Sequence, residues 1–174
     1  DLQSHRAEYY WNYRLFIMII FDLDQTVIDS SHRALVRPDG TLDLDAWRAC
    51  STWEYICRDS LLPIAQLWRS AMKRGEHIII CTARVMTAPD FLFLEAYGLQ
   101  FDACLSRDGE RDNRADWILK RDLLTGYAHS LGLSWRRFAA DCVAYDDNAK
   151  ILDYYTSAGI LAHNAIELNK SLTR

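Results

Sequence analysis

Short apolar runs alternate with amphipathic stretches along most of this chain. The apolar runs have the length of buried strands and occupy residues 15–20, 77–82, 101–105, 142–145 and 160–163. The stretches between them repeat apolar positions with helical spacing over residues 60–73, 87–97, 113–131 and 148–158. Strands that alternate with helices of this length predict a parallel sheet with helices on both faces. We therefore expect a doubly wound, Rossmann-like α/β fold with three layers, α/β/α.

Local signals mark the ends of several predicted helices. Two basic residues precede Gly75, which is typical of a helix C-terminus. Thr87 is followed three positions later by Asp90, which predicts an N-cap for the next helix. Gly98 is expected to end that helix.

Residues 29–59 do not fit the alternation of strands and helices. They contain the turn sequence Pro38-Asp39-Gly40 and two tryptophans, Trp47 and Trp53. We interpret them as a small cap inserted over the carboxyl edge of the sheet. Both tryptophans are expected to pack within this insertion, with stacking of a base by either one as the alternative.

The first residues of the chain also lack periodicity. We interpret residues 1–14, which are polar and aromatic, as an N-terminal extension or as residues ahead of an alternative start at Met18. Residues 15–174 are predicted to form a single domain, since 50% of the 174 residues are hydrophobic and can build one core.

Charge and cysteine content restrict the class of protein. The net charge of −4 gives no overall basic field, which argues against tight non-specific duplex binding but not against a local basic groove. Five cysteines without a CxxC pair favour reduced thiols and a cytoplasmic location. No apolar run is long enough to span a bilayer or has the flanks of a signal peptide, so no membrane association is expected. Nothing in the sequence indicates an obligate protein partner.

Carboxylates follow two of the predicted strands. Asp22 and Asp24 come after the first strand, and Asp146 and Asp147 come after the fourth. Ionised carboxylates beside an apolar core are costly unless a cation compensates them. Ligands of open parallel sheets bind beyond the carboxyl ends of the strands, where the strand order reverses. If these two strands flank that point, their carboxylates form a site suited to Mg²⁺.

Further polar residues are expected at the same edge of the sheet. Thr82 and Arg84 are placed beyond the second strand and Arg107 beyond the third. Asp116 and Lys120 lie four residues apart on one face of the following helix. A metal, a hydroxyl and a lysine around paired carboxylates suit phosphoryl transfer, in which one carboxylate attacks phosphorus and the other moves the proton.

At these residues the chain resembles the haloacid dehalogenase (HAD) superfamily of aspartate-nucleophile phosphatases. Four motifs of that superfamily occur in order between residues 16 and 163: Asp22-x-Asp24-x-Thr26, a strand ending in Thr82, Lys120, and Asp146-Asp147. The resemblance implies a HAD-like fold, Mg²⁺ as cofactor and an aspartyl-phosphate intermediate.

The same resemblance implies a role for each motif residue. Asp22 corresponds to the nucleophile, Asp24 to the general acid and base, and Thr82 and Lys120 to the phosphate-binding residues. The implied metal ligands are Asp22, the backbone carbonyl of Asp24, Asp146 and Asp147.

A narrower resemblance is to the 3′-phosphatase domain of bacteriophage-type polynucleotide kinase/phosphatases. It rests on Cys81-Thr82-Ala83-Arg84, Arg107-Asp108-Gly109-Glu110-Arg111, Asp116 with Lys120, and Tyr145-Asp146-Asp147-Asn148. The central stretch is one residue shorter than the family pattern, threonine replaces the more usual serine, and the phosphate-binding loop of a kinase half is missing. We assign substrate binding to Thr26, Arg84, Arg107, Arg111 and Asp116.

Each feature also has a simpler interpretation when taken alone. Asp22 and Asp24 can be turn residues after a strand, and residues 146–148 can cap the following helix. Asp116 and Lys120 can form a solvated helix pair of little consequence. The arginines at 107, 111 and 114 can be a solvated charge cluster.

Three functions are therefore compared. The preferred one is removal of a terminal phosphate, expected to be a 3′-phosphate, from a nucleic-acid end or nucleotide. The second is a small-molecule phosphatase such as a 5′-nucleotidase, which the modest acidic charge favours. The third is a non-catalytic HAD-fold binding module, which predicts a damaged nucleophile or acid. Neither residue is damaged in this sequence.

Overall fold

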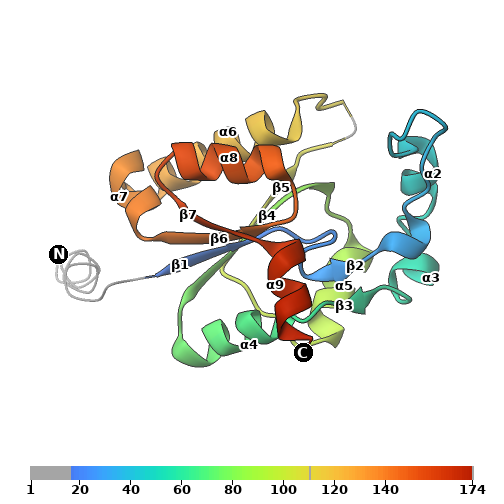
Figure 1. The fold of residues 1–174 in the computed structure, drawn as a ribbon, viewed down its shortest axis with the longest axis horizontal. Coiled ribbons are helices and arrows are strands. Elements are labelled where there is room, and N and C mark those ends of the chain that lie inside the picture. The colour runs from blue at the N-terminus through green and yellow to red at the C-terminus, as the bar shows by residue number, and fades with distance from the viewer. Residues whose placement is uncertain (1–16, 110, 174) are drawn as a thin grey trace.

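Five parallel strands form the central sheet of the computed structural model, which describes residues 17–109 and 111–173. The strands are β1 (Met18–Phe21), β4 (His77–Val85), β5 (Ala103–Arg107), β6 (Cys142–Asp146) and β7 (Leu161–Asn164). Their order is β5-β4-β1-β6-β7 (Figure 1). The chain moves outward from β1 through β4 to β5, and then returns to the other side of β1. This reversal places the carboxyl ends of β1 and β6 side by side.

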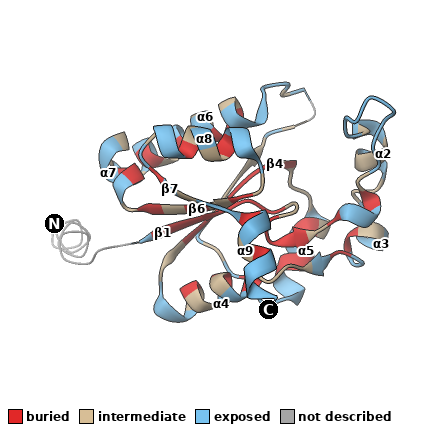
Figure 2. Cartoon of the chain, viewed as in Figure 1, coloured by how far each residue is buried: buried red, intermediate tan, exposed pale blue. Residues whose placement is uncertain are grey.

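The central strand β1 is buried on both faces. Ile19 and Phe21 belong to one apolar core, and Met18 and Ile20 belong to the other. Phe21 also stacks on Trp68, with 4.9 Å between the ring centroids. Figure 2 shows the buried residues along the sheet and on the inner sides of the helices. A strand buried on both faces requires a continuous apolar run, which is why the sequence predicts it clearly.

Helices cover both faces of the sheet. One layer contains α4 (Ala65–Arg74), α5 (Ala88–Ala96) and α9 (Ala165–Leu172). The opposite layer contains α6 (Asp116–Ser130), α7 (Trp135–Ala140) and α8 (Ala149–Ser157). The two layers lie on opposite sides of the sheet in Figure 1. The predicted three-layer, doubly wound fold is therefore confirmed.

Three helix-end predictions are confirmed, among them Gly98, which follows the end of α5 with a φ of 67°. Gly75 ends α4 with a φ of 67°, a left-handed conformation that costs glycine little. Thr87 and Asp90 form a reciprocal capping box at the start of α5. The Asp90 carboxylate accepts from the Thr87 backbone N–H at 2.8 Å and from its hydroxyl at 2.7 Å.

The carboxyl ends of two strands differ from the prediction. β4 continues to Val85, so Thr82 and Arg84 lie within the strand and not beyond it. β5 ends at Arg107, which pairs with Val85 after a shift in register. Polar residues can continue a strand when a neighbouring strand supplies hydrogen-bond partners, and sequence periodicity does not reveal such pairing.

Other boundaries also differ. α4 begins five residues later than predicted, because Ser60 and Leu61 form strand β3. α6 begins at Asp116 instead of residue 113. Helices α7 and α9 were not predicted. Part of the first predicted strand, residues 15 and 16, and the predicted extension at residues 1–14 lie outside the described residues.

The segment between β1 and α4 projects from the carboxyl edge of the sheet (Figure 1). Its elements are β2 (Ile28–Asp29), the 3₁₀ turn η1 (Ser31–Arg33), α2 (Leu44–Ala49), α3 (Trp53–Ile56) and β3 (Ser60–Leu61). β2 and β3 pair antiparallel, so the chain leaves and returns at neighbouring points. Near that base, the buried Arg33 and Asp59 side chains form an ion pair at 2.8 Å. We call residues 29–59 the inserted segment.

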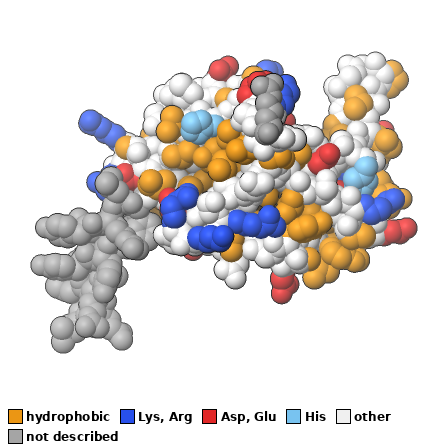
Figure 3. Space-filling view, turned by 60° about the horizontal axis from the view of Figure 1, so that its bottom comes forward, with side chains coloured by type: hydrophobic (Ala, Val, Ile, Leu, Met, Phe, Trp, Pro, Cys, Tyr) orange, Lys and Arg blue, Asp and Glu red, His pale blue; other side chains and the backbone are white. Residues whose placement is uncertain are grey.

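The surface mixes apolar and charged side chains. Figure 3 turns the side with α4, α5 and α9 toward the viewer and shows apolar side chains between lysines and arginines. The large apolar residues exposed on α5 and α9 are Phe91, Leu92, Ile166 and Leu172. Among the helices described, none combines the length and the apolarity needed to cross a membrane.

Candidate active site

A pocket of about 710 Å³ lies at the carboxyl ends of β1, β4 and β6. Asp22 follows β1, Thr82 lies in β4, and Asp146 is the last residue of β6. Lys120 enters from the second turn of α6, and residues of the inserted segment complete the lining. The volume is in the range of small-molecule sites, roughly 300–1,000 Å³. The structure thus brings together four predicted site residues from four separate parts of the chain.

Lys120 lies between two carboxylates at the base of this pocket. Its Nζ donates to Asp22 Oδ1 at 2.7 Å and to Asp146 Oδ2 at 2.6 Å. The side chains of Lys120 and Asp146 are each 1% exposed. In such a low-dielectric setting, the ammonium offsets the repulsion between the two acids. The solvated Asp116–Lys120 pair considered from the sequence is therefore wrong for Lys120.

Burial and the neighbouring charges both shift the pKa values of Asp22 and Lys120. Burial raises the pKa of Asp22 to about 8, against the lowering effect of Lys120, and the nearby Asp146 adds to the rise. Burial alone would lower the pKa of Lys120, but Asp22 and Asp146 hold it above its ordinary value. A cation bound at these carboxylates would favour the ionised form of Asp22.

Three carboxylates form a group that fits a divalent cation. Asp22, Asp146 and Asp147 each place an oxygen within 4.8 Å of the others. Burial, followed by the charge of Asp146, raises the pKa of Asp147 to about 6. Oxygen-only donors with excess negative charge suit Mg²⁺. The carboxylate of Asp24 is outside the group, which is compatible with a role for its backbone carbonyl alone.

Asp24 is held by an arginine and a serine. Arg84 donates from Nε to Asp24 Oδ2 at 3.0 Å and from Nη2 to Oδ1, and Ser30 Oγ donates to Oδ1 at 2.7 Å. Burial alone would raise the pKa of Asp24, but the charge and hydrogen bonds of Arg84 lower it below its usual value. The Asp24 carboxylate is therefore held in its ionised form.

Arg84 also binds a second acid, which corrects its predicted role. Its Nη1 donates to Asp90 Oδ1 at 2.5 Å, and the Arg84 side chain is only 4% exposed. Two edges of the guanidinium group are thus engaged by carboxylates of the protein. Arg84 lines the pocket, but the structure shows it as the partner of Asp24 and Asp90 and not as a free phosphate-binding group.

The two threonines of the motifs occupy different environments. Thr82 lines the pocket, and its Oγ1 accepts from the Arg84 backbone N–H at 3.2 Å. Thr26 has no exposed surface and is not among the pocket residues. Its Oγ1 has no hydrogen-bond partner among the described residues, and its carbonyl accepts from Asn169 Nδ2 at 3.0 Å. The assignment of Thr26 to substrate binding is therefore corrected, because the surrounding fold covers the side chain.

Arg107 organises the loop between β5 and α6. Its Nη2 donates to Asp116 Oδ1 at 2.8 Å, and its Nη1 donates to the carbonyls of Asp112 and Arg114 at 2.5 and 3.1 Å. Arg107 and Asp116 both line the pocket. Arg111 is exposed and lies outside the pocket lining. The structure therefore does not bring Arg111 to the site, and it gives Arg107 a scaffolding contact in place of the predicted phosphate contact.

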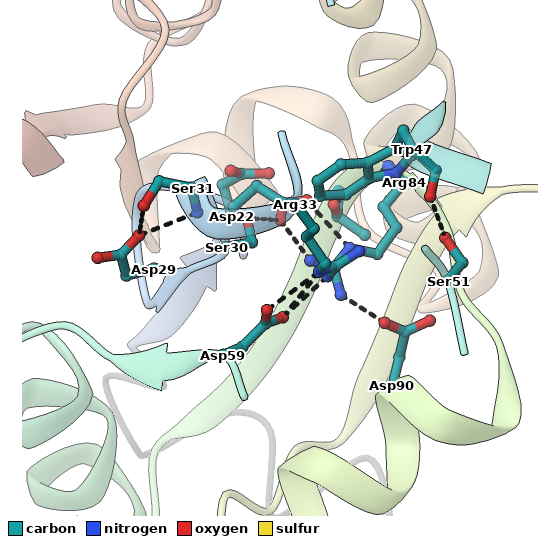
Figure 4. A network of polar contacts seen from close by, with 12 residues as sticks. Asp22, Asp29, Ser30, Ser31, Arg33, Trp47, Ser51, Asp59, Arg84 and Asp90 are labelled. Atoms are coloured by element: carbon teal, nitrogen blue, oxygen red, sulfur yellow. Dashed lines mark hydrogen bonds and ion pairs between the residues drawn. The ribbon is translucent and has the colours of Figure 1, made fainter. Parts of the chain in front are cut away.

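Several residues near the site were not assigned from the sequence. Trp47 lines the pocket, with the Arg33 guanidinium 4.1 Å from its ring centroid and that of Arg84 at 5.5 Å. Figure 4 shows Arg33, Arg84 and Trp47 close together, with Asp59 and Asp90 as the carboxylate partners. The only sequence signal for Asp90 was its position as a helix cap, which does not indicate a partner 6 residues away.

The sequence matches one described family over nearly its full length. A family model described as bacteriophage T5 5′-deoxynucleotidase matches residues 11–174. The 5′-deoxynucleotidase of Escherichia phage T5 is 39% identical over 90 residues, which cover 48% of this chain and 36% of that protein. The match thus spans little more than a third of the length of this curated relative.

Solved structures show the same fold at low sequence identity. A chain of the Pnkp1/Rnl/Hen1 complex matches with a TM-score of 0.64 and 22% identity, over 85% of this chain and 44% of that chain. A haloacid dehalogenase-like hydrolase from Streptococcus pneumoniae has a TM-score of 0.56 and 14% identity, over 90% and 98% of the two chains. A HAD-superfamily hydrolase from Geobacter sulfurreducens also has a TM-score of 0.56, with 12% identity, over 92% and 98%.

These comparisons agree with the four motifs found in the sequence. The solved structures show that the fold is shared, and the family model shows to which family the sequence is related. The HAD-like fold that the resemblance implied is confirmed. The chain belongs to the bacteriophage T5 5′-deoxynucleotidase family.

Proposed function

We propose that this chain is a Mg²⁺-dependent phosphomonoesterase that hydrolyses nucleoside 5′-monophosphates through an aspartyl-phosphate intermediate. The observation that carries the proposal is the group at the base of the pocket. There, Lys120 bridges Asp22 and Asp146 at 2.7 and 2.6 Å, and Asp147 completes three converging carboxylates. Once it holds a divalent cation, such a group can accept a dianionic phosphate and present a carboxylate to phosphorus.

In the proposed reaction, an Asp22 carboxylate oxygen forms a bond to phosphorus while the bond from phosphorus to the ester oxygen breaks. Asp24, which Arg84 holds ionised in the free protein, takes up a proton from solvent as the substrate binds and gives it to the departing oxygen. Ionised Asp24 then takes a proton from water, whose oxygen attacks phosphorus and releases phosphate from Asp22. Burial alone would raise the pKa of Asp24, but Arg84 outweighs this effect and lowers the pKa. The lowered pKa favours the ionised form of Asp24, which the second step uses.

The metal and the remaining residues stabilise charge in this scheme. Asp22, Asp146, Asp147 and the backbone carbonyl of Asp24 would hold Mg²⁺, which supplies positive charge beside the phosphate oxygens. Lys120 and the Thr82 hydroxyl bind those oxygens from the protein side. This division of labour places one nucleophile and at least two charge-stabilising groups around a single phosphate.

The charges around the pocket favour a mononucleotide over a nucleic-acid end. Among the described residues, five cations line the pocket and each is ion-paired with an aspartate of the protein: Arg48, Arg84, Arg107, Arg114 and Lys120. Recognition of a nucleic-acid strand needs additional basic side chains that contact the phosphates along it. The family match supports the same choice, since the T5 relative is named a 5′-deoxynucleotidase. Removal of a 3′-phosphate, the preference from the sequence, becomes the competing proposal.

A substrate panel separates these proposals. Purified protein with Mg²⁺ is assayed for phosphate release from 5′-mononucleotides, from 3′-phosphorylated oligonucleotides and from an aryl phosphate, with Asp22→Asn as the inactive control. The proposal expects release from 5′-mononucleotides that exceeds release from 3′-phosphorylated ends. If release from 3′-phosphorylated ends exceeds release from 5′-mononucleotides, the proposed substrate is wrong and the competing 3′-phosphatase proposal takes its place. If the unchanged protein matches Asp22→Asn on every substrate, the phosphatase proposal fails and a binding role takes its place.

A further inference from the structure

The wall that the inserted segment adds to the pocket lining has seven residues: four are apolar, and the other three are Ser30, Arg48 and Ser51. Ala34, Leu42, Leu44 and Trp47 all line the pocket. Leu42 is 38% exposed and Leu44 is 50% exposed. A ligand that covers large apolar side chains removes their surface from water, which favours binding. This wall is therefore suited to an apolar or aromatic part of a substrate whose phosphate lies at Asp22.

Trp47 is the rigid part of that wall. The Arg33 guanidinium lies over its ring, 4.1 Å from the ring centroid. Arg33 is itself fixed by three hydrogen bonds to Asp59, from Nε at 3.0 and 3.2 Å and from Nη2 at 2.8 Å. Arg33 is only 2% exposed, so this contact comes from the protein side of the ring. The indole is thus held in place while still lining the pocket. A fixed aromatic surface can stack a planar base at little entropic cost.

The proposed function supplies the phosphate site, and our inference rests on it. We propose that Trp47 and the two leucines, Leu42 and Leu44, bind the nucleoside of the substrate, with the base stacked on the indole. The inserted segment would then select nucleotides over other phosphate esters, whereas Asp22 and Lys120 act on the phosphate of either. Trp47 is in this account a specificity-determining residue of the pocket.

The test compares a nucleotide with the same phosphate lacking its base. kcat/KM is measured for thymidine 5′-monophosphate and for 2-deoxyribose 5-phosphate in the unchanged protein, Trp47→Ala, Trp47→Phe and Leu44→Ser. Trp53→Ala and Leu35→Ser serve as matched controls, because both residues are exposed parts of the inserted segment outside the pocket lining. We expect Trp47→Ala to lose about tenfold to a hundredfold more on the nucleotide than on the sugar phosphate. Trp47→Phe should retain most of the preference.

The outcomes separate this inference from the function on which it rests. If the unchanged protein hydrolyses the sugar phosphate but not the nucleotide, the nucleotidase proposal fails and this inference falls with it. If it prefers the nucleotide and Trp47→Ala loses equally on both substrates, only the role of Trp47 in base binding is overturned. Leu44→Ser changes an exposed side chain, so it provides the same comparison if Trp47→Ala does not fold. The inference would also be overturned if the preference for the nucleotide over the sugar phosphate stays unchanged in all three variants, Leu44→Ser, Trp47→Phe and Trp47→Ala.

Discussion

Arg84 is bound by two carboxylates at once, Asp24 through Nε and Nη2 and Asp90 through Nη1. Its side chain is 4% exposed and that of Asp90 is 3% exposed. All three guanidinium nitrogens of Arg84 thus donate to carboxylates of the protein. Its contribution is to orient Asp24 and to offset the repulsion between Asp24 and the buried Asp90.

Replacing Arg84 by alanine should therefore destabilise the protein strongly. The change leaves Asp90 buried without its cation, a situation that typically costs about 3–5 kcal/mol in the free energy of unfolding. Urea unfolding of Arg84→Ala and of the control Arg114→Ala measures the difference. Arg114 is also ion-paired, but its own side chain is 41% exposed. Arg114→Ala should be far less destabilised. Similar losses in the two variants would contradict the structural role assigned to Arg84.

Residue patterns predicted only part of this site. The convergence of Asp22, Lys120 and Asp146 was expected because each follows or faces the end of a strand in a known order. The Arg84–Asp90 pair was not expected, since it depends on how far β4 continues beyond Thr82. Direction and length of a side chain decide such pairs, and neither follows from sequence spacing.

At the level of the elements, the strands of the sheet carry three of the five cysteines. Cys81 lies in β4, Cys104 in β5 and Cys142 in β6, whereas Cys50 and Cys57 belong to the inserted segment. Burial raises the pKa of Cys81 to about 12, with Lys120 opposing and Asp146 adding to the rise. Burial likewise raises the pKa of Cys104 to about 11.

The strand thiols should therefore be unreactive in the folded protein. A thiol with a pKa near 12 stays protonated at pH 7 and at pH 9, and reaction requires the thiolate. We expect Ellman's reagent to label the exposed Cys57 first, with Cys81 and Cys142 labelled only after unfolding in guanidinium chloride. Cys57→Ser should remove the fast phase. Rapid labelling of Cys81 in the folded protein would show that β4 opens readily, contrary to this structure.

Element boundaries illustrate a second limit of prediction. The apolar core of each strand was found because residues buried on both faces must be apolar. The polar continuation of β4 to Val85 was missed, since its pairing with Arg107 of β5 is a contact between distant parts of the chain. Ser60 and Leu61 were placed in a helix because their partner in β2 is likewise remote in sequence.

On the scale of the whole molecule, the fold brings acids from opposite ends of the chain to one point. Asp22 and Asp146 contact the same Lys120 Nζ, although 98 residues separate Asp22 from Lys120. The three-layer architecture could be predicted because alternating strands and helices admit few arrangements. The position of the inserted segment against the pocket could not be predicted in the same way, because it has no repeating pattern.

Mg²⁺ should stabilise the folded protein, since the carboxylates converge only in that state. Binding at a concentration one hundred times the dissociation constant would add about 2.7 kcal/mol to the free energy of unfolding. Tm is measured with Mg²⁺ and with EDTA for the unchanged protein, Asp146→Asn and Asp153→Asn. Asp146→Asn should lose most of the Mg²⁺-dependent rise in Tm. Asp153→Asn, which changes an exposed acid of α8 outside the carboxylate group, should keep it.

Trapping the phosphorylated enzyme shows whether Asp22 attacks phosphorus. The protein and its Asp24→Asn variant are mixed with a 5′-mononucleotide and Mg²⁺, quenched in acid within a single turnover, and mapped by peptide mass spectrometry. We expect one phosphoryl group on Asp22 of the unchanged protein, and slower overall phosphate release in Asp24→Asn, which lacks both the acid of the first step and the base of the second. Nucleoside release without any phosphorylated Asp22 in either protein, or a phosphoryl group on another residue, would contradict attack by Asp22.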